Sequence, residues 1–140
     1  MVNLITGPKG SGKTQQMIDL ANQVSKTSNG NVVLIKKSHR DTYSVDFNVR
    51  AICMADYADI KNIDEFIGFL YGMVAGNHDI ETIFIDGILK QVDISLVSLP
   101  DFMEKINKVS ADNKIDFYLS ISATVDEMKG VNLDHCKVLS

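Results

Sequence analysis

The stretch "LITGPKGSGKT", residues 4–14, decides the fold of this chain. Its last eight residues fit the pattern G-x-x-x-x-G-K-[ST] at every fixed position. These residues are Gly7, Pro8, Lys9, Gly10, Ser11, Gly12, Lys13 and Thr14. The short apolar run 2–6 before them predicts a buried strand, and apolar residues recur at helical spacing after them, at Met17, Leu20, Ala21 and Val24. A strand, a glycine-rich turn and a helix in this order predict a loop that binds phosphate groups.

Each part of this loop has a physical reason to bind a nucleoside triphosphate. Its glycines let successive backbone N–H groups point inward at phosphate oxygens, and the helix that begins near Gly12 or Lys13 adds its positive end. Lys13 is predicted to reach the β- and γ-phosphates as a catalytic charge, and Thr14 to offer its hydroxyl to Mg²⁺. We therefore expect all eight residues to bind nucleotide, with ATP as the default and GTP less favoured.

A second motif, "TIFIDG" at 82–87, has the form of the strand that holds magnesium in such proteins, in which apolar or β-branched residues precede an aspartate. Asp86 falls at the end of this predicted strand, where ligands bind in open α/β sheets. We expect Asp86 to fix Mg²⁺ through a bound water, with Thr14 as the other protein ligand. Asp86 is therefore a catalytic candidate together with Lys13.

The order of these segments resembles the RecA-like group of P-loop NTPases. The resemblance implies that the strand predicted at 116–122 lies between the two motif strands, and that a polar residue at its end faces the γ-phosphate. Ser122 is the candidate for this catalytic position, with Thr124 second. A strand-end serine with only local hydrogen bonds is an equal alternative.

The same group commonly carries a glutamate after the magnesium aspartate, and this glutamate orients or deprotonates the attacking water. Here the position is Gly87, which has no side chain to do so. Asp93, Asp41 and Asp46 are candidate substitutes if folding brings them close, although each is more readily explained as a surface charge.

The stretch "VVLIKKSHRDTYSVDFNVRAICMA" (32–55) resembles type II thymidine kinase, in which a lysine-bearing strand runs into a "D-x-R-Y-S"-like loop and a return strand. Here the loop reads Asp41-Thr42-Tyr43-Ser44, without the internal arginine. The resemblance covers residues 1–86. The catalytic glutamate of that family falls on Gly87, and its zinc-binding cysteines and C-terminal base-binding loop have no match. The resemblance therefore implies a shared fold rather than thymidine kinase activity.

Strand signals recur along the chain, and helix signals separate most of them. Strands are expected at 2–6, 32–36, 49–55, 82–86 and 116–122, and a further short one is open at 137–140. Such alternation implies parallel pairing with right-handed crossovers. At 140 residues we expect a single domain spanning 1–140. The predicted fold is a three-layer α/β sandwich of about five mostly parallel strands, the P-loop NTPase fold.

Two further helices are predicted from apolar stripes at helical spacing. The first begins at a capping box of Asn62 and Glu65 and ends near Gly76; its stripe consists of Ile63, Phe66, Ile67, Leu70 and Val74. The second begins near Ser98, Pro100 and Asp101; its buried face consists of Phe102, Met103, Ile106 and Val109. Two segments stay open: 37–48 is an exposed loop or a hairpin, and 87–97 is a strand or an active-site loop.

Charge narrows the choice of partners. The net charge of −4 argues against a general nucleic-acid coat, which needs a basic surface. Nucleic acid is therefore not expected as a partner, while a protein partner and the oligomeric state stay open. The basic cluster "KKSHR" (36–40) fits a solvated loop better than a contact to nucleic acid or a substrate phosphate. Arg40 and Arg50 are the only arginines, few for an enzyme of phosphoryl transfer.

The cysteines and the lack of a long apolar run indicate the compartment in which we expect the protein. Cys53 and Cys136 are far apart, without a C-x-x-C partner, and His135 beside Cys136 is not a metal-ligand spacing, so we expect two buried free thiols in a reducing compartment. No apolar run approaches the roughly 20 residues of a membrane span, and the first strand begins without room for a signal peptide. We expect a cytoplasmic protein.

The sequence N-K-x-D at 113–116 has the form of the guanine-recognition motif of GTPases. In GTPases that motif follows a hydrophobic strand, whereas here it precedes one. We therefore expect a helix-to-strand turn at the sheet edge opposite the phosphates.

Three functions compete at this point. We favour a Mg²⁺-dependent ATPase or phosphotransferase whose activity is low or depends on a partner. Gly87 and the shortage of arginines support the alternative of a non-hydrolysing nucleotide sensor or regulatory module. A RecA-like motor subunit that works on nucleic acid is a second alternative, and the acidic net charge weighs against it.

Overall fold

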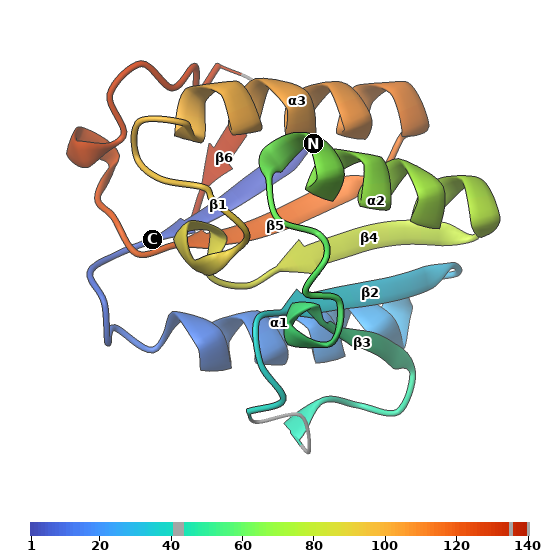
Figure 1. Cartoon of the computed structure of the whole chain (residues 1–140). Coiled ribbons are helices and arrows are strands. Elements are labelled where there is room, and N and C mark those ends of the chain that lie inside the picture. The colour runs from blue at the N-terminus through green and yellow to red at the C-terminus, as the bar shows by residue number, and fades with distance from the viewer. Residues whose placement is uncertain (41–43, 135, 140) are drawn as a thin grey trace.

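The apolar runs of the sequence form one parallel β-sheet between two layers of helices (Figure 1). The computed structural model describes residues 1–40, 44–134 and 136–139. Within this part of the chain the strands are β1 (Val2–Thr6), β2 (Asn31–Lys36), β3 (Val49–Cys53), β4 (Ile80–Ile85), β5 (Asp116–Ile121) and β6 (Cys136–Val138). The helices are α1 (Lys13–Thr27), α2 (Ile63–Gly76) and α3 (Leu99–Asn113), and the short 3₁₀ turns are η2 (Met54–Asp56), η3 (Ile88–Lys90) and η4 (Val125–Glu127). The predicted three-layer α/β sandwich is confirmed.

The order of the strands in the sheet is β3-β2-β4-β5-β1-β6, and every neighbouring pair is parallel. This order places β5 between the two motif strands β1 and β4, as the resemblance to the RecA-like group implies. The sheet has six described strands where about five were expected, because the short β6 pairs with β1 at the edge. The carboxyl ends of β1 and β4 therefore meet at one edge of the sheet with only β5 between them, which brings the two motifs together.

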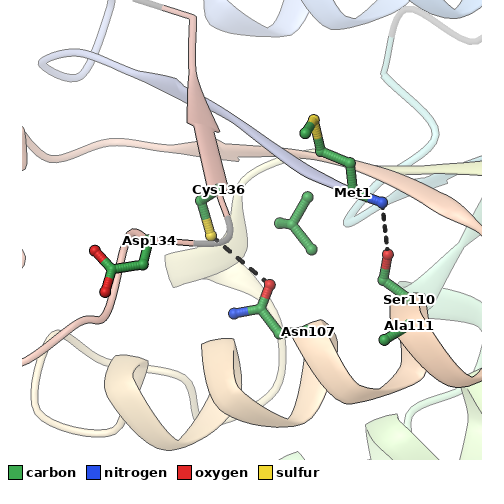
Figure 2. A pocket seen from close by; sticks show the side chains of 7 residues that line it. Met1, Asn107, Ser110, Ala111, Asp134 and Cys136 are labelled. Atoms are coloured by element: carbon green, nitrogen blue, oxygen red, sulfur yellow. Dashed lines mark hydrogen bonds between the residues drawn. The ribbon is translucent and has the colours of Figure 1, made fainter.

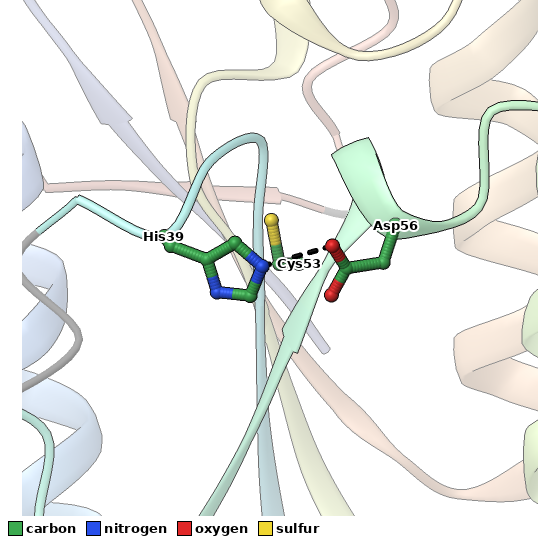
Figure 3. A group of neighbouring side chains, drawn as sticks. All are labelled: His39, Cys53 and Asp56. Atoms are coloured by element: carbon green, nitrogen blue, oxygen red, sulfur yellow. Dashed lines mark hydrogen bonds and ion pairs between the residues drawn. The ribbon is translucent and has the colours of Figure 1, made fainter.

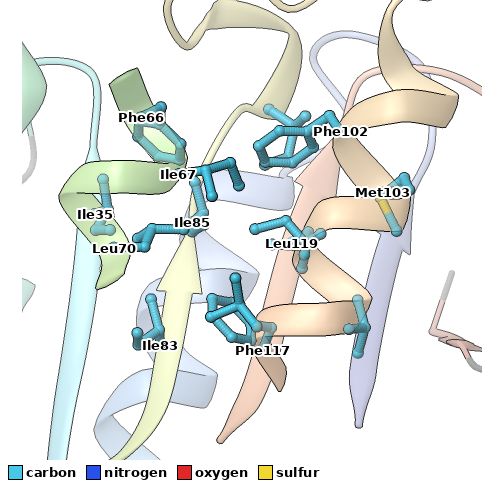
Figure 4. Packing of buried hydrophobic residues seen from close by; sticks show 14 of the residues in the cluster. Ile35, Phe66, Ile67, Leu70, Ile83, Ile85, Phe102, Met103, Phe117 and Leu119 are labelled. Carbon is cyan, nitrogen blue, oxygen red and sulfur yellow. The ribbon is translucent and has the colours of Figure 1, made fainter. Parts of the chain in front are cut away.

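The continuous apolar runs reflect burial on both faces of the sheet. In β4, Ile83 and Ile85 pack in the core beneath α2 and α3, whereas Phe84 packs in the core on the side of α1. Figure 4 shows the first of these cores, in which Phe66 of α2 and Phe102 of α3 meet above the sheet with ring centroids 6.1 Å apart. Successive residues of one strand therefore pack against helices on opposite faces of the sheet.

The helix signals of the sequence act nearly as predicted. Asn62 Oδ1 accepts a hydrogen bond from the backbone N–H of Glu65 (2.9 Å), which is one half of the expected capping box. The carboxylate of Glu65 accepts from the N–H of Lys61 (2.7 Å), one residue earlier than a capping box requires. The predicted box is therefore only half right. Pro100 lies in the first turn of α3, whose N-cap is Ser98.

Two predicted segments differ in the structure. The strand expected at 49–55 ends at Cys53 and continues as η2. The segment 87–97 contains no strand, although "VDISL" alternates. The physical reason is that β4 already pairs with β2 and β5, and the chain leaves the sheet so that Ile88 and Ile94 fill the core beneath α2 and α3. None of the described helices combines the length and the apolar character needed to cross a membrane.

Candidate functional site

Residues 7–14, the predicted phosphate loop, join β1 to α1 at the carboxyl edge of the sheet. Gly12, the N-cap of α1, has φ = 83°, a left-handed conformation that glycine adopts without the steric cost of a side chain. The N–H of Gly7 donates to the carbonyl of Ala123 (3.1 Å), just beyond β5. The loop is therefore fixed to the neighbouring strand, and the first turn of α1 opens toward the cavity above the sheet.

Lys13 lies on the concave side of the loop. Its Nζ donates to the carbonyls of Gly7 (3.1 Å) and Pro8 (2.7 Å) and to the hydroxyl of Ser11 (3.1 Å). Burial lowers the pKa of Lys13, while the charge of Asp86 opposes this shift and the charge of Lys90 adds to it. A phosphate oxygen is a charged acceptor and forms stronger hydrogen bonds with an ammonium group than these neutral acceptors do. The position of Lys13 therefore suits the binding of an anion.

Thr14 and Asp86 come from different motifs and touch each other. Thr14 Oγ1 donates to Asp86 Oδ2 over 3.1 Å, between residues 72 positions apart in the chain. Hydroxyl and carboxylate oxygens are the ligand types that Mg²⁺ and its bound waters prefer. The contact therefore suits the predicted arrangement, in which Thr14 binds the ion directly and Asp86 holds it through a water.

Ser120 on β5 completes this arrangement, and the sequence analysis did not single it out. Its hydroxyl donates to Asp86 Oδ1 (2.7 Å) and accepts from the N–H of Gly87 (2.6 Å), and its side chain is buried. Its contact with Asp86 follows from the register of the parallel strands, in which Ile85 pairs with Leu119. Asp86 and Ser120 each come one residue later, and no motif in the sequence reveals this register.

The two candidates beyond β5 have different surroundings. Ser122 lines the cavity above the phosphate loop, as predicted for a residue that faces the γ-phosphate. Thr124 instead forms a capping box at the start of η4, where its backbone N–H and its hydroxyl both contact Glu127 Oε1 (3.0 and 3.2 Å). The described geometry thus retains Ser122 as the candidate, and its catalytic role stays a prediction.

Gly87, where the resemblance places a glutamate, has a special backbone conformation. Its φ is 67°, in the left-handed region, and it begins the turn η3. A Cβ atom at this position would lie 3.4 Å from Cδ of Lys90, an ordinary van der Waals contact, so space alone does not exclude a side chain. The left-handed φ is what would strain a residue with a side chain here. The backbone conformation at position 87, as well as the sequence, therefore disfavours a glutamate there.

The two motifs line one cavity of about 550 Å³, a volume typical of small-molecule sites. Its described lining includes six cationic side chains, which are Lys9, Lys13, Lys36, Lys37, Arg40 and Lys90. Asp86 is the single carboxylate among the described residues of this lining. The cavity is thus strongly positive although the chain as a whole carries a charge of −4, which suits a polyanionic ligand.

In the described part of the chain, the carboxylates considered as substitutes for the missing glutamate do not line this cavity. Asp93 is exposed and Asp46 half-buried, and neither lines the cavity. Asp41, together with Thr42 and Tyr43 of the thymidine-kinase-like loop, lies outside the described residues. The described part of the site therefore holds magnesium-type ligands but no second carboxylate next to them.

The basic segment 36–40 is more than a solvated loop. Lys37, Ser38 and Arg40 are exposed, as predicted, and they also line the cavity. Lys36 is buried at the end of β2, and its Nζ contacts the carbonyl of Arg40. Arg50, in contrast, lines a different cavity between β3 and α2. Of the two arginines, Arg40 is the one placed to meet an anion in the phosphate cavity.

A further cavity, of about 470 Å³, lies at the amino ends of β1 and β6 and is unrelated to the phosphate loop (Figure 2). Met1, Asn107, Ser110 and Cys136 line it. Burial raises the pKa of the Cys136 thiol, which is half-buried, whereas Cys53 is fully buried. Cys136 is thus less buried than predicted.

The N-K-x-D sequence lies at the same amino-terminal edge of the sheet. Asp116, its last residue, begins β5 and bonds the amino group of Met1 (3.2 Å). The motif is therefore at the edge opposite the phosphate loop, as the sequence predicts, and His135 lies outside the described residues.

Comparisons with known proteins add the fold class. No protein-family model matches the chain, and no curated protein matches it. Among solved structures 103 chains match, so the architecture is widely used and carries no specific function by itself. One of them is a KaiC-like protein from the hyperthermophilic archaeon Pyrococcus horikoshii OT3, with a TM-score of 0.64 and 16% sequence identity.

The fold is that of the RecA-like P-loop NTPases. The match covers 87% of this chain but 61% of the KaiC-like chain, so this chain spans less than two thirds of that protein. At 16% identity the likeness concerns the fold alone. The comparisons do not show the resemblance to type II thymidine kinase, which stays a prediction.

Proposed function

We propose that this chain binds Mg²⁺–ATP at the phosphate loop, and that it hydrolyses ATP or transfers its γ-phosphate at a rate that is low or depends on a partner. GTP is the less favoured nucleotide. The observation that carries the proposal is the contact between Thr14 Oγ1 and Asp86 Oδ2 (3.1 Å). It joins the predicted magnesium ligands of two separate motifs beside the phosphate loop, inside a cavity lined by cationic side chains.

In this proposal the residues of the loop have distinct tasks. The backbone N–H groups of residues 9–14, which include the first turn of α1, hold the phosphates. Lys13 leaves the carbonyls of Gly7 and Pro8 and contacts the phosphates instead. Asp86 keeps its orientation because Ser120 holds its other oxygen (2.7 Å). Ser122 faces the γ-phosphate as a catalytic candidate. The magnesium ion neutralises phosphate charge when it is bound.

The slow or partner-dependent rate follows from what the described lining contains. Asp86 is its single carboxylate and is the proposed metal ligand. Gly87 contributes no side chain, and its backbone conformation disfavours one. A group that orients or deprotonates the attacking nucleophile is therefore expected from a protein partner or from the acceptor itself.

The same observation favours a second candidate, a nucleotide sensor that binds Mg²⁺–ATP without turning it over. In a sensor the segment 36–40, which lines the cavity, changes its surroundings when the phosphates are bound. The two candidates differ in a single measurable quantity, the phosphate released per bound ATP.

Calorimetry with Mg²⁺–ATP, together with an assay of free phosphate on the same preparation, tests both candidates. The matched pair of variants is Lys13→Ala and Lys26→Ala, because Lys26 is an exposed lysine in the last turn of the same helix. Binding that Lys13→Ala removes and Lys26→Ala retains supports nucleotide binding. Phosphate release that follows the same pattern favours the enzyme, and binding without release favours the sensor. A wild-type protein that binds neither ATP nor GTP contradicts both.

A further inference from the structure

Three side chains with metal-binding atoms converge beside the basic segment 36–40 (Figure 3). His39 follows β2, Cys53 is the last residue of β3, and Asp56 ends the turn η2. His39 Nε2 and Asp56 Oδ1 are 2.9 Å apart. The ligand atoms that the three residues offer all lie within 4.8 Å of one another. A nitrogen, a sulfur and an oxygen donor thus face a common point.

The fold, rather than chance contact of flexible side chains, brings these residues together. β2 and β3 are parallel neighbours in which Lys36 pairs with Cys53, so the chain just after β2 lies beside the end of β3. The carbonyl of Lys37 then accepts from the N–H of Ala55 (3.1 Å) and from the thiol of Cys53 (3.4 Å). These contacts fix the backbone on both sides of the cluster, because they join the segment that carries His39 to the segment that carries Cys53 and Asp56.

We propose that His39, Cys53 and Asp56 form a binding site for a divalent transition metal, with Zn²⁺ as the expected ion and water as the fourth ligand. An imidazole, a thiolate and a carboxylate form a donor set that Zn²⁺ accepts, whereas Mg²⁺ prefers oxygen ligands. In a tetrahedral zinc site, ligand atoms lie about 3.5 Å from one another. To reach this geometry, His39 Nε2 and Asp56 Oδ1 move apart by roughly half an ångström from 2.9 Å, and ligand atoms at the upper limit of 4.8 Å approach by roughly 1 Å.

Charge and burial are compatible with such a site. The Cys53 thiol loses its proton to solvent when the metal binds, and the resulting thiolate and the Asp56 carboxylate balance the two positive charges of the ion. The occupied site is then neutral overall. Cys53 is buried, while the side chains of His39 and Asp56 are 67% and 50% exposed. An ion can therefore enter from solvent and be held by the buried sulfur.

The position of the site gives it a consequence for the rest of the molecule. Ser38 and Arg40, which flank His39 in the chain, both line the phosphate cavity. A metal bond to His39 attaches this segment to the end of β3 and limits where Arg40 can lie. The metal site itself does not depend on the proposed nucleotide function, since none of its three ligands lines that cavity.

Cobalt substitution tests the site directly. Untagged full-length protein is freed of metal with a chelator and titrated with Co²⁺ without nucleotide. We expect one Co²⁺ per chain, with a thiolate-to-cobalt absorption in the near ultraviolet and the visible bands of a tetrahedral ion, and we expect Zn²⁺ to abolish both. Cys53→Ser removes the thiolate band. His39→Ala and Asp56→Asn weaken Co²⁺ binding by about tenfold or more.

The chain provides matched controls for the thiol ligand and for the imidazole ligand. Cys136→Ser removes the other thiol, and His78→Ala removes a histidine in the turn between α2 and β4, and both are expected to keep the wild-type spectrum. Circular dichroism of the metal-free variants checks folding. If Cys53→Ser does not fold, the exposed positions His39 and Asp56 decide the question. A wild-type protein without a thiolate band overturns the proposal, as does a band that survives Cys53→Ser or disappears in Cys136→Ser, or binding unaffected by both His39→Ala and Asp56→Asn.

Discussion

Two junctions at the carboxyl edge of the sheet differ in how their geometry is determined. At the end of β1, Lys13 is held locally, because its Nζ donates to Gly7, Pro8 and Ser11 of its own loop. At the end of β4, Asp86 and Gly87 are held by Ser120, from a strand more than 30 residues later. The first junction is therefore a local motif, whereas the second exists only because β5 lies beside β4. Local motifs are readable in a sequence, and motifs shared between strands require the register.

The strongest way to break the first junction is Lys13→Ala. Hydrogen bonds to charged groups contribute about 1.5–3 kcal/mol each, and Lys13 is proposed to contact two phosphates. We expect nucleotide binding to weaken by about 3 kcal/mol or more, which is a factor of more than 100 at 25 °C. Calorimetry measures the loss, with Lys26→Ala as the control. An equal loss in the control variant would mean that the general positive charge, rather than the loop, holds the nucleotide.

Asp86→Asn weakens the second junction by removing the charge that attracts Mg²⁺. We expect ATP affinity in Mg²⁺ to fall by about 1.5–2 kcal/mol, the size of a charge-assisted contact. In a chelator, where no metal links Asp86 to the phosphates, we expect no loss, because the variant has one fewer negative charge near the anion. The ratio of the two affinities is the quantity to measure. A ratio that is unchanged by the substitution would contradict the magnesium role of Asp86.

Ser120→Ala examines the link between β5 and the second junction. It leaves Asp86 Oδ1 and the N–H of Gly87 without the hydroxyl that now pairs with both. We expect the free energy of unfolding to fall by about 1–2 kcal/mol, because buried polar groups that lose a partner are costly. Urea unfolding measures this change. Ser122→Ala, two residues further on, is the matched control and is expected to leave stability within about 0.5 kcal/mol.

The smallest effect is expected at Gly87. Gly87→Ala places a side chain at φ = 67°, which costs about 1 kcal/mol of stability, again measured by urea unfolding. Gly87→Glu asks a sharper question, since it restores the residue that the RecA-like group commonly carries. We expect no increase in phosphate release, because the left-handed backbone does not direct the side chain as an extended residue would. A clear increase would show that sequence alone, rather than backbone conformation, limits turnover.

The sequence by itself was sufficient for the fold class and for the order of strand, glycine-rich loop and helix at residues 2–27. Apolar periodicity identified five of the segments that became strands, and the three helices, because burial on two faces or one leaves different patterns in the chain. The sixth strand, the short β6, was left open. The loop at 7–14 was readable because its residues act on one another over a few positions. The segment 87–97 was ambiguous because its alternation suits a strand. In the folded sheet both sides of β4 are already paired, with β2 and with β5, so no further strand can lie beside β4.

Only the tertiary structure revealed the remaining features of the site. Ser120 became relevant through the β4–β5 register, and the segment 36–40 became part of the cavity lining because β2 lies next to β4. The cluster of His39, Cys53 and Asp56 likewise depends on the pairing of β2 with β3. The apolar periodicity of a sequence indicates which face of its own helix or strand each residue occupies. The distances between residues on different strands are determined by strand order and register, and these result from packing of the whole sheet.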